Sequence, residues 1–197
     1  MTAPPCMKHA WLALVLAACT REPAPAPKCP PPTPPAAVDP GEPVGLPAGY
    51  VEVRPAQVVP MGEQVALLLV DEPDNLVLPV FIGGTEGASI DTRMRHEPPP
   101  RPLTHDLLDH LMEKLHAKLV QVQVDSLRRD GEGGVFIGAI FVRSEGHVMR
   151  LDARPSDAVA LAIGNHVPIY VKRAVLDDAG YKWDEVQRQL QQLGSAT

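Results

Sequence analysis

The stretch Arg150-Leu-Asp-Ala-Arg-Pro-Ser-Asp-Ala-Val-Ala-Leu-Ala-Ile163 joins an apolar strand to an apolar helix. Three charged side chains, Asp152, Arg154 and Asp157, lie within six positions at the junction. Charges beside an apolar helix are costly unless they are paired, and a helix start gathers backbone amides that lack partners. We therefore expect these side chains to cap the helix, to pair with one another or to carry a function, with Ser156 as the helix cap.

The chain divides into a proline-rich leader and a globular body. Of its 197 residues 23 are proline, and most of these precede Tyr50 or lie in the run Pro98–Pro100. Hydrophobic residues make up 45% of the chain, which is enough for a core in a domain of this length. The net charge of −6 argues against a broad basic surface that binds duplex nucleic acid through many phosphates.

The leader has the features of an export signal. A short apolar run, residues 10–18, follows the basic start Met7-Lys-His9, and it is shorter than the roughly 20 residues of a transmembrane helix. Its end, Leu16-Ala-Ala-Cys19, resembles the lipobox of bacterial lipoproteins. That resemblance implies lipidation of Cys19 and a membrane-anchored protein of the cell envelope, on the outer rather than the inner membrane because Thr20 follows. The alternative is a core helix that happens to end in cysteine.

We expect four segments along the chain. They are a signal peptide at 1–19, an extended proline-rich tether at 20–49, a globular domain at 50–180 and a helical tail at 181–197.

The body predicts an α+β fold with a mixed, largely antiparallel and barrel-like sheet on which helices pack. Strands are expected at 50–59, 64–71, 76–82, 119–127, 135–142, 147–152 and 167–171. Helices are expected at about 85–94, from 104 to 115, at 156–163, around 175–176 and at 183–193. The run 64–71 is almost wholly apolar, which predicts burial on both faces, and Pro55 predicts an edge strand or a bulge.

The expected helix starts carry side chains suited to capping. Thr85 and Glu86 begin the first helix, and Thr104 begins the second. The second helix has apolar residues at helical spacing, namely Leu107, Leu108, Leu111, Met112 and Leu115.

The chain contains a weak internal repeat, in which Thr85-Glu-Gly-Ala-Ser-Ile90 is similar to Ser156-Asp-Ala-Val-Ala-Leu161. In each case several strands lead into a helix that begins with a hydroxyl, a carboxylate and a small residue. The pattern indicates either a duplicated β-β-β-α unit or a chance repeat of short helix starts.

Three segments together resemble the bifunctional nuclease family. They are Ile82-Gly-Gly-Thr-Glu86, Arg101-Pro-Leu-Thr-His-Asp-Leu107, and Leu151-Asp-Ala-Arg-Pro-Ser-Asp-Ala-Val-Ala-Leu161 with Pro168-Ile-Tyr-Val171. The likeness covers about residues 50–180 and implies hydrolysis of RNA or DNA. The chain departs from the family pattern at Gly87, where alanine is usual, and at Gly164, where an arginine is common and would offer a phosphate contact.

Phosphodiester hydrolysis needs positive charge on the phosphate and an activated water, which Mg²⁺ or Mn²⁺ held by carboxylates commonly supplies. The resemblance points to catalytic roles for His105, Asp106, Asp152 and Asp157, metal binding by Glu86, Asp106 and Asp157, and phosphate binding by Arg101 and Arg154. Histidine suits general acid–base work, and arginine suits a bidentate grip on phosphate.

Each of these residues also has a structural interpretation. Glu86, Asp106 and Asp157 can stabilise helix starts by roughly 0.3–1 kcal/mol each without any chemistry. Asp152 and Arg154 can form an ion pair that orders their loop, and His105 can be a hydrogen-bonded structural histidine. A second hypothesis is therefore a non-catalytic binding or scaffold domain of the envelope that forms a homo-oligomer.

Overall fold

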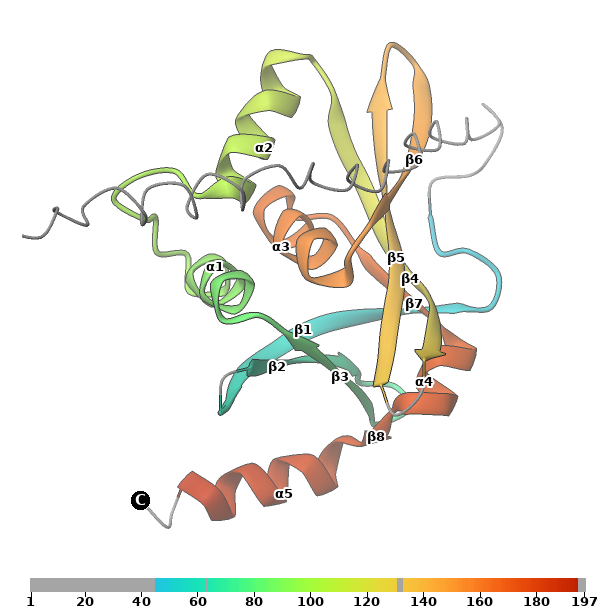
Figure 1. Cartoon of the computed structure of the whole chain (residues 1–197). Helices are drawn as coiled ribbons and strands as arrows, with labels where there is room; N and C mark the ends of the chain where they lie inside the picture. The colour runs from blue at the N-terminus through green and yellow to red at the C-terminus, as the bar shows by residue number, and fades with distance from the viewer. Residues whose placement is uncertain (1–44, 63, 131–132, 195–197) are drawn as a thin grey trace, which may run out of the picture. The chain divides into compact units, whose positions relative to one another are not determined.

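The computed structural model of the protein describes residues 45–62, 64–130 and 133–194 (Figure 1). The predicted signal peptide, the lipobox cysteine Cys19 and nearly all of the tether lie outside the described residues. In the part of the chain that is described, no helix is both long and apolar enough to cross a membrane.

One eight-stranded sheet organises the domain, in the order β6-β5-β4-β7-β1-β2-β3-β8. The strands are β1 (Tyr50–Met61), β2 (Gln64–Asp71), β3 (Leu76–Ile82), β4 (Lys118–Asp130), β5 (Gly133–Ser144), β6 (His147–Ala153), β7 (Ile169–Lys172) and β8 (Tyr181–Lys182). Neighbouring strands run antiparallel except β4 and β7, which are parallel. The predicted α+β class with a mixed, largely antiparallel sheet is confirmed. The barrel-like closure was wrong, because β6 and β8 are free edges among the described strands.

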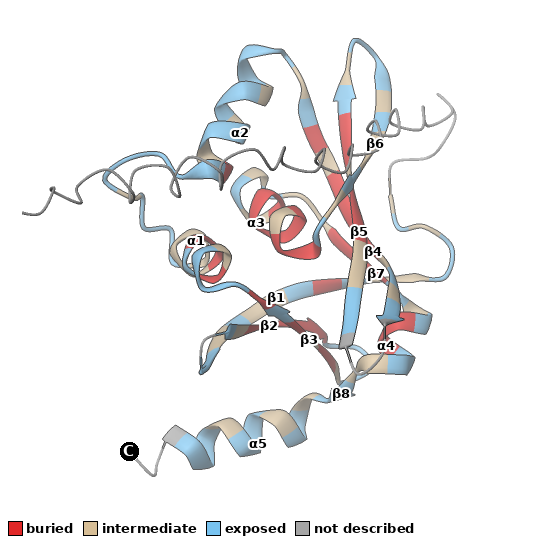
Figure 2. Cartoon of the chain, in the orientation of Figure 1, coloured by how far each residue is buried: buried red, intermediate tan, exposed pale blue. Residues whose placement is uncertain are grey.

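Helices cover both faces of this sheet. They are α1 (Gly84–Met94), α2 (Thr104–Lys114), α3 (Pro155–Asn165), α4 (Arg173–Ala179) and α5 (Trp183–Gly194). Figure 1 shows α1 and α3 together on one side of β1, β2 and β3, and α5 on the opposite side. Figure 2 shows the contrast in burial between α3, which is mostly buried, and α2 and α5, which are mostly exposed.

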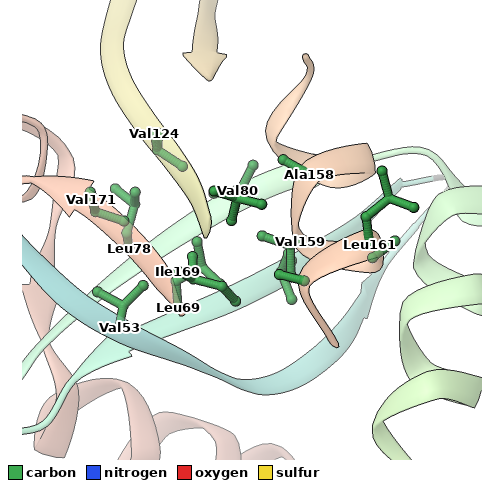
Figure 3. Close-up of a cluster of buried hydrophobic side chains, with 14 of the residues drawn as sticks. Val53, Leu69, Leu78, Val80, Val124, Ala158, Val159, Leu161, Ile169 and Val171 are labelled. Atoms are coloured by element: carbon green, nitrogen blue, oxygen red, sulfur yellow. The ribbon is translucent and has the colours of Figure 1, made fainter. Parts of the chain in front are cut away.

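The apolar strand β2 is buried on both faces, as its continuous hydrophobic run predicts. Leu67 and Leu69 belong to the main core cluster, while Leu68 and Val70 belong to a second cluster against which Trp183 of α5 packs. The main core lies between the sheet and α3, whose Ala158, Val159 and Leu161 meet side chains from β1, β2, β3, β4 and β7 (Figure 3). This packing fixes the first turn of α3 against the sheet.

The structure also contains the bulge at Pro55 and the repeated β-β-β-α order that the sequence suggested. The register of β1 against β2 shifts between Pro55 and Gln57, so Pro55 marks a bulge, and β1 lies inside the sheet rather than at an edge. Three antiparallel strands also lead into a helix twice, as β1-β2-β3-α1 and as β4-β5-β6-α3.

The helix starts differ from the predicted caps. The residues that precede α1, α2 and α3 are Gly83, Leu103 and Arg154, and none of these makes a side-chain cap bond. Thr104 is already the first residue of α2, and Asp106 satisfies that start by accepting the backbone N–H of Leu103 at 2.8 Å. Ser156 is buried in the first turn of α3, one position after Pro155. Proline suits the first helical position because it has no amide hydrogen that would need a partner.

Arg93 of α1 holds α2 and α3 in place. Its guanidinium pairs with Asp106 at 2.7 Å and Asp109 at 2.8 Å, both on α2, and donates to the carbonyl of Ala160 on α3 at 2.9 Å. The side chain is only 9% exposed. Gly164 makes this approach feasible, because a Cβ at that position would lie 1.9 Å from Nη1 of Arg93.

Replacing Gly164 by alanine is therefore expected to lower the free energy of unfolding by about 1–3 kcal/mol, the usual cost of overpacking. Chemical denaturation followed by circular dichroism measures this. Gly84→Ala is the matched control, since a Cβ there meets nothing within 4 Å. Equal stability of the two variants would mean that Arg93 can move aside freely.

Candidate functional site

The first turns of three helices meet at one cavity of about 380 Å³. The lining residues are Thr85, Glu86 and Ser89 of α1, Pro102 and Leu103 of the preceding loop, Thr104 and His105 of α2, and Arg154 and Asp157 at the start of α3. Helix N-termini carry unpaired amides and partial positive charge, so they favour anions. The cavity combines that field with two carboxylates, a guanidinium and an imidazole.

Arg154 links the two carboxylates of the cavity. Its Nε donates to Oδ2 of Asp157 at 2.7 Å, its Nη2 donates to Oδ1 of the same residue at 2.9 Å, and Nη2 also lies 2.9 Å from Oε1 of Glu86. The Arg154 side chain is 65% exposed, so solvent and ligands can reach the guanidinium. The ion pair of Arg154 with Asp152 that the sequence suggested was wrong, because its partners are Asp157 and Glu86.

His105 connects Asp157 to a buried serine. Its Nδ1 lies 2.9 Å from Oγ of Ser89, and its Nε2 lies 3.3 Å from Oδ1 of Asp157. In the tautomer that donates Nε2–H to Asp157, Nδ1 accepts the hydroxyl hydrogen of Ser89. Both His105 and Ser89 are buried, so this chain of hydrogen bonds fixes the imidazole against the cavity wall.

The electrostatics of the cavity favour charged forms of Asp157 and Arg154. Partial burial by itself would raise the pKa of Asp157, but the hydrogen bonds from Arg154 and His105 outweigh it and the pKa lies below its ordinary value. The hydrogen bond to Asp157 raises the pKa of Arg154. The ion pair is therefore intact at neutral pH.

A pH dependence of stability follows from the lowered pKa of Asp157. The unfolded chain binds the proton more readily than the folded one, so the ion pair stabilises the fold above the unfolded pKa and loses this effect as pH falls through the folded pKa. The stability advantage of the unmodified protein over Asp157→Asn should be constant above about pH 5 and shrink below it. Thermal melts of both proteins from pH 3 to 8, in the pH range where both fold, measure this difference. A gap that stays constant down to the acid limit would contradict the lowered pKa.

Glycines shape the α1 side of the cavity. A Cβ at Gly83 would lie 2.6 Å from Oε2 of Glu86, so this glycine lets the carboxylate fold back over the helix start. A Cβ at Gly87 would lie 2.4 Å from Val65, so Gly87 allows α1 to approach β2 closely. Gly83 therefore permits the observed position of the Glu86 side chain, and Gly87 permits the observed position of α1.

The structure brings together four of the sequence-predicted residues, Glu86, His105, Arg154 and Asp157. It does not bring the others into this cavity. Asp106 faces Arg93, Asp152 is exposed on β6 opposite Ala139, and Arg101 is exposed in the loop before α2.

The three-carboxylate metal set expected from the sequence is not assembled. Oδ1 of Asp106 pairs with Arg93, and Oδ2 accepts the N–H of Leu103. Across the described residues, no group of three or more His, Cys, Asp or Glu side chains is placed to hold a metal ion. Glu86 and Asp157 are the two carboxylates that line this cavity.

Two residues of the site region, Ser89 and Arg93, were missed by sequence reasoning. Glu86, Ser89 and Arg93 stand at positions i, i+3 and i+7 of α1, so they share a helix face. That polar row was the available signal. The sequence does not reveal that this row meets α2 and α3.

Comparison with known proteins decides the family. A model of the bifunctional nuclease domain matches residues 67–184, which is more than half of the chain. The chain belongs to the bifunctional nuclease domain family. Two proteins of Mycobacterium tuberculosis, from strains CDC 1551 and H37Rv and both described as uncharacterized, are each 39% identical to it over 132 residues, which is 67% of this chain and 76% of the relative.

The resemblance predicted from the sequence is thus confirmed, and family membership points to a function connected with nucleic acid. The matched region of this bifunctional nuclease domain contains every residue that lines the cavity. The segments that carry the resemblance, 82–86, 101–107 and 151–161, each contribute lining residues. Three of the segments that carry the resemblance therefore build the cavity.

Proposed function

We propose that this protein is a nuclease that hydrolyses phosphodiester bonds of RNA, DNA or both, with Mg²⁺ or Mn²⁺ as its cofactor. One observation carries the proposal. The reachable guanidinium of Arg154 stands between Glu86 and Asp157 at a cavity where three helix N-termini meet. Guanidinium groups and helix N-termini are the groups that proteins use to bind phosphate. Membership of the bifunctional nuclease domain family supports the same chemistry.

The donor set of the cavity fits a divalent metal of this kind. Mg²⁺ in phosphate-processing sites is commonly held by one or two carboxylates together with waters and substrate phosphates. Glu86 and Asp157 supply two such carboxylates within the cavity, whereas Asp106 does not line it and pairs with Arg93. We assign the metal to Glu86 and Asp157. When bound, such a cation supplies positive charge to the oxygens of the phosphate.

The remaining residues have distinct roles in the proposed hydrolysis. Arg154 binds the phosphate after turning away from one of its carboxylate partners, which its exposure allows. In the tautomer that donates Nδ1–H to Oγ of Ser89, Nε2 of His105 carries no hydrogen. Once substrate displaces the contact of Nε2 with Asp157, Nε2 can take the proton of the attacking water and return it to the leaving oxygen.

Cleavage assays test the proposal. The purified protein is incubated with single-stranded RNA and with single-stranded DNA in the presence of Mg²⁺, Mn²⁺ or EDTA. Cleavage is expected with metal and not with EDTA, and Asp157→Asn is expected to reduce it at least about 100-fold. Asp178→Asn is the matched control, because that carboxylate pairs with Arg129 outside the cavity. Equal cleavage by Asp157→Asn and the control would overturn the assignment.

The proposal includes attachment to the cell envelope through a lipid on Cys19, on the outer rather than the inner membrane. It is supported by the apolar run 10–18, the segment ending at Cys19 and the proline-rich stretch that follows. Fractionation of cells that express the unmodified protein or Cys19→Ser tests it. A membrane fraction that does not depend on Cys19 would contradict lipid attachment.

A second candidate is the non-catalytic, oligomeric binding or scaffold domain. The observation that favours it is the apolar face of α2, where Leu107, Leu111 and Leu115 are 64%, 51% and 63% exposed. A second copy packed antiparallel on this helix would bury the leucines, and the dipoles of the two antiparallel helices would attract each other. Light scattering on the unmodified protein and Leu111→Ser tests self-association. A monomeric mass for the unmodified protein would exclude it.

A further inference from the structure

A second cavity adjoins the Arg154 cavity. It also measures about 380 Å³, and it shares Ser89, Pro102 and Leu103 with its neighbour. Its other lining residues are Thr92, Arg93, His96, Glu97, Pro98, Pro99, Asp106 and His110. The two cavities are therefore neighbours along the loop between α1 and α2, and we refer to them together as the trough.

The chemistry of the two halves differs. The Arg154 half offers an exposed cation and three helix N-termini, which suit a phosphate. In the other half the cation, Arg93, has a side chain that is only 9% exposed and paired with Asp106, Asp109 and a carbonyl oxygen, so an anion cannot reach it. This half presents the exposed rings of His96 and His110 together with stiff proline walls, and the exposed carboxylate of Glu97 keeps phosphates on the Arg154 side. Histidine rings and apolar walls suit the flat face of a nucleobase.

The size and charge of the trough also limit what can enter. Each half lies at the lower end of ligand pocket volumes, about 300–1,000 Å³, which corresponds to one small ligand group at a time. A duplex binder instead needs many exposed cations to contact phosphates, and this chain carries a net charge of −6. Stacking on side-chain rings requires bases that are not already stacked in a duplex.

We propose that the trough binds a single-stranded polynucleotide, with one phosphodiester at Arg154 and the adjacent nucleobase against His96 and His110. This inference rests on the proposed nuclease function and names its substrate class. It makes His96 and His110 binding residues that neither cleave nor hold metal. Because stacking tolerates every base, the trough accepts RNA and DNA strands of varied sequence.

Fluorescence anisotropy tests the proposal with the full-length protein. The probe is a fluorescein-labelled eight-nucleotide single strand, RNA or DNA, compared with the same strand annealed to its complement, and EDTA is present so that the probe stays intact. The single strand is expected to bind at least tenfold more tightly than the duplex. His110→Ala is expected to weaken single-strand binding about fivefold or more, as the loss of one stacked base does. His96→Asn, which suits the positive φ of 56° at that residue, should weaken it similarly.

His147→Ala is the matched control, because His147 is an exposed histidine on β6 that lines neither cavity. Duplex binding as tight as single-strand binding, or His110→Ala and His96→Asn both binding like the control, would overturn the proposal. Hydrolysis of bis(p-nitrophenyl) phosphate, tested separately on the unmodified protein, reports on the nuclease function itself. If single-strand binding depends on the two histidines and neither this diester nor polynucleotide is hydrolysed, the trough stands and the nuclease proposal fails.

Discussion

Replacing Arg93 by methionine is expected to lower the free energy of unfolding by about 3–5 kcal/mol, the cost of breaking a buried ion pair by removing one partner. Methionine keeps the unbranched stem but removes the guanidinium, and this leaves Asp106, Asp109 and the carbonyl of Ala160 without their shared donor. The effect should be large because α2 has few apolar contacts to replace these links, His105 being its one buried residue among those described. Urea denaturation measures the change.

Hydrogen exchange adds a local readout to the same comparison. Backbone amides of α2 should lose protection before those of α3, since Arg93 ties α2 to the rest of the domain. Arg95→Met is the matched control, because Arg95 forms an exposed pair with Asp91 on the same helix and such pairs contribute about 0–1 kcal/mol. If Arg93→Met is as stable as Arg95→Met, α2 is held by something other than the guanidinium. The buried Nε of Arg93 lacks a hydrogen-bond partner, and that places the expected loss toward the lower end of the range.

Replacing His105 by glutamine is expected to slow cleavage by about 10²–10⁴-fold, the range for loss of a general acid–base group. Glutamine can still hydrogen-bond Ser89 or Asp157, so the fold should remain intact, but it cannot exchange a proton near neutral pH. The rate of cleavage as a function of pH separates chemistry from structure. The pH dependence of the cleavage rate should change shape in His105→Gln, because glutamine can neither take nor give a proton.

His147→Ala is again the control for this experiment, as an exposed histidine outside the cavity. A melting temperature close to that of the unmodified protein is required for the comparison. Should His105→Gln cleave at the rate of the control with an unchanged pH profile, His105 would be the hydrogen-bonded structural residue that the sequence also allowed. Loss of stability with full specific activity would lead to the same conclusion.

Much of the fold could be predicted from local patterns. The apolar run 64–71 implied a strand buried on both faces, and β2 indeed contributes to two core clusters. Pro55 implied an edge strand or a bulge because proline lacks the ladder donor, and the structure has the bulge. Closure of the sheet could not be predicted, because it depends on pairing between distant strands.

The site was predictable in part for a similar reason. Glu86, His105, Arg154 and Asp157 stand at helix starts, which sequence signals locate well, and those starts converge. Asp106 carries the same local signal, yet its oxygens turn to Arg93 and to its own helix start. Side-chain direction follows from the neighbouring helices, so sequence spacing cannot separate Asp106 from Asp157.

The sequence alone determined the elements, the α+β class and the family of this protein, because these depend on periodicity, turn residues and a specific motif. The tertiary structure decided which charges meet. Arg154 pairs with Glu86, which is 68 positions earlier (154 − 86) in the chain, rather than with the nearby Asp152. It also decided that the leucine row of α2 faces outward while polar Ser89 and Arg93 face inward, since burial depends on which element lies opposite each helix face.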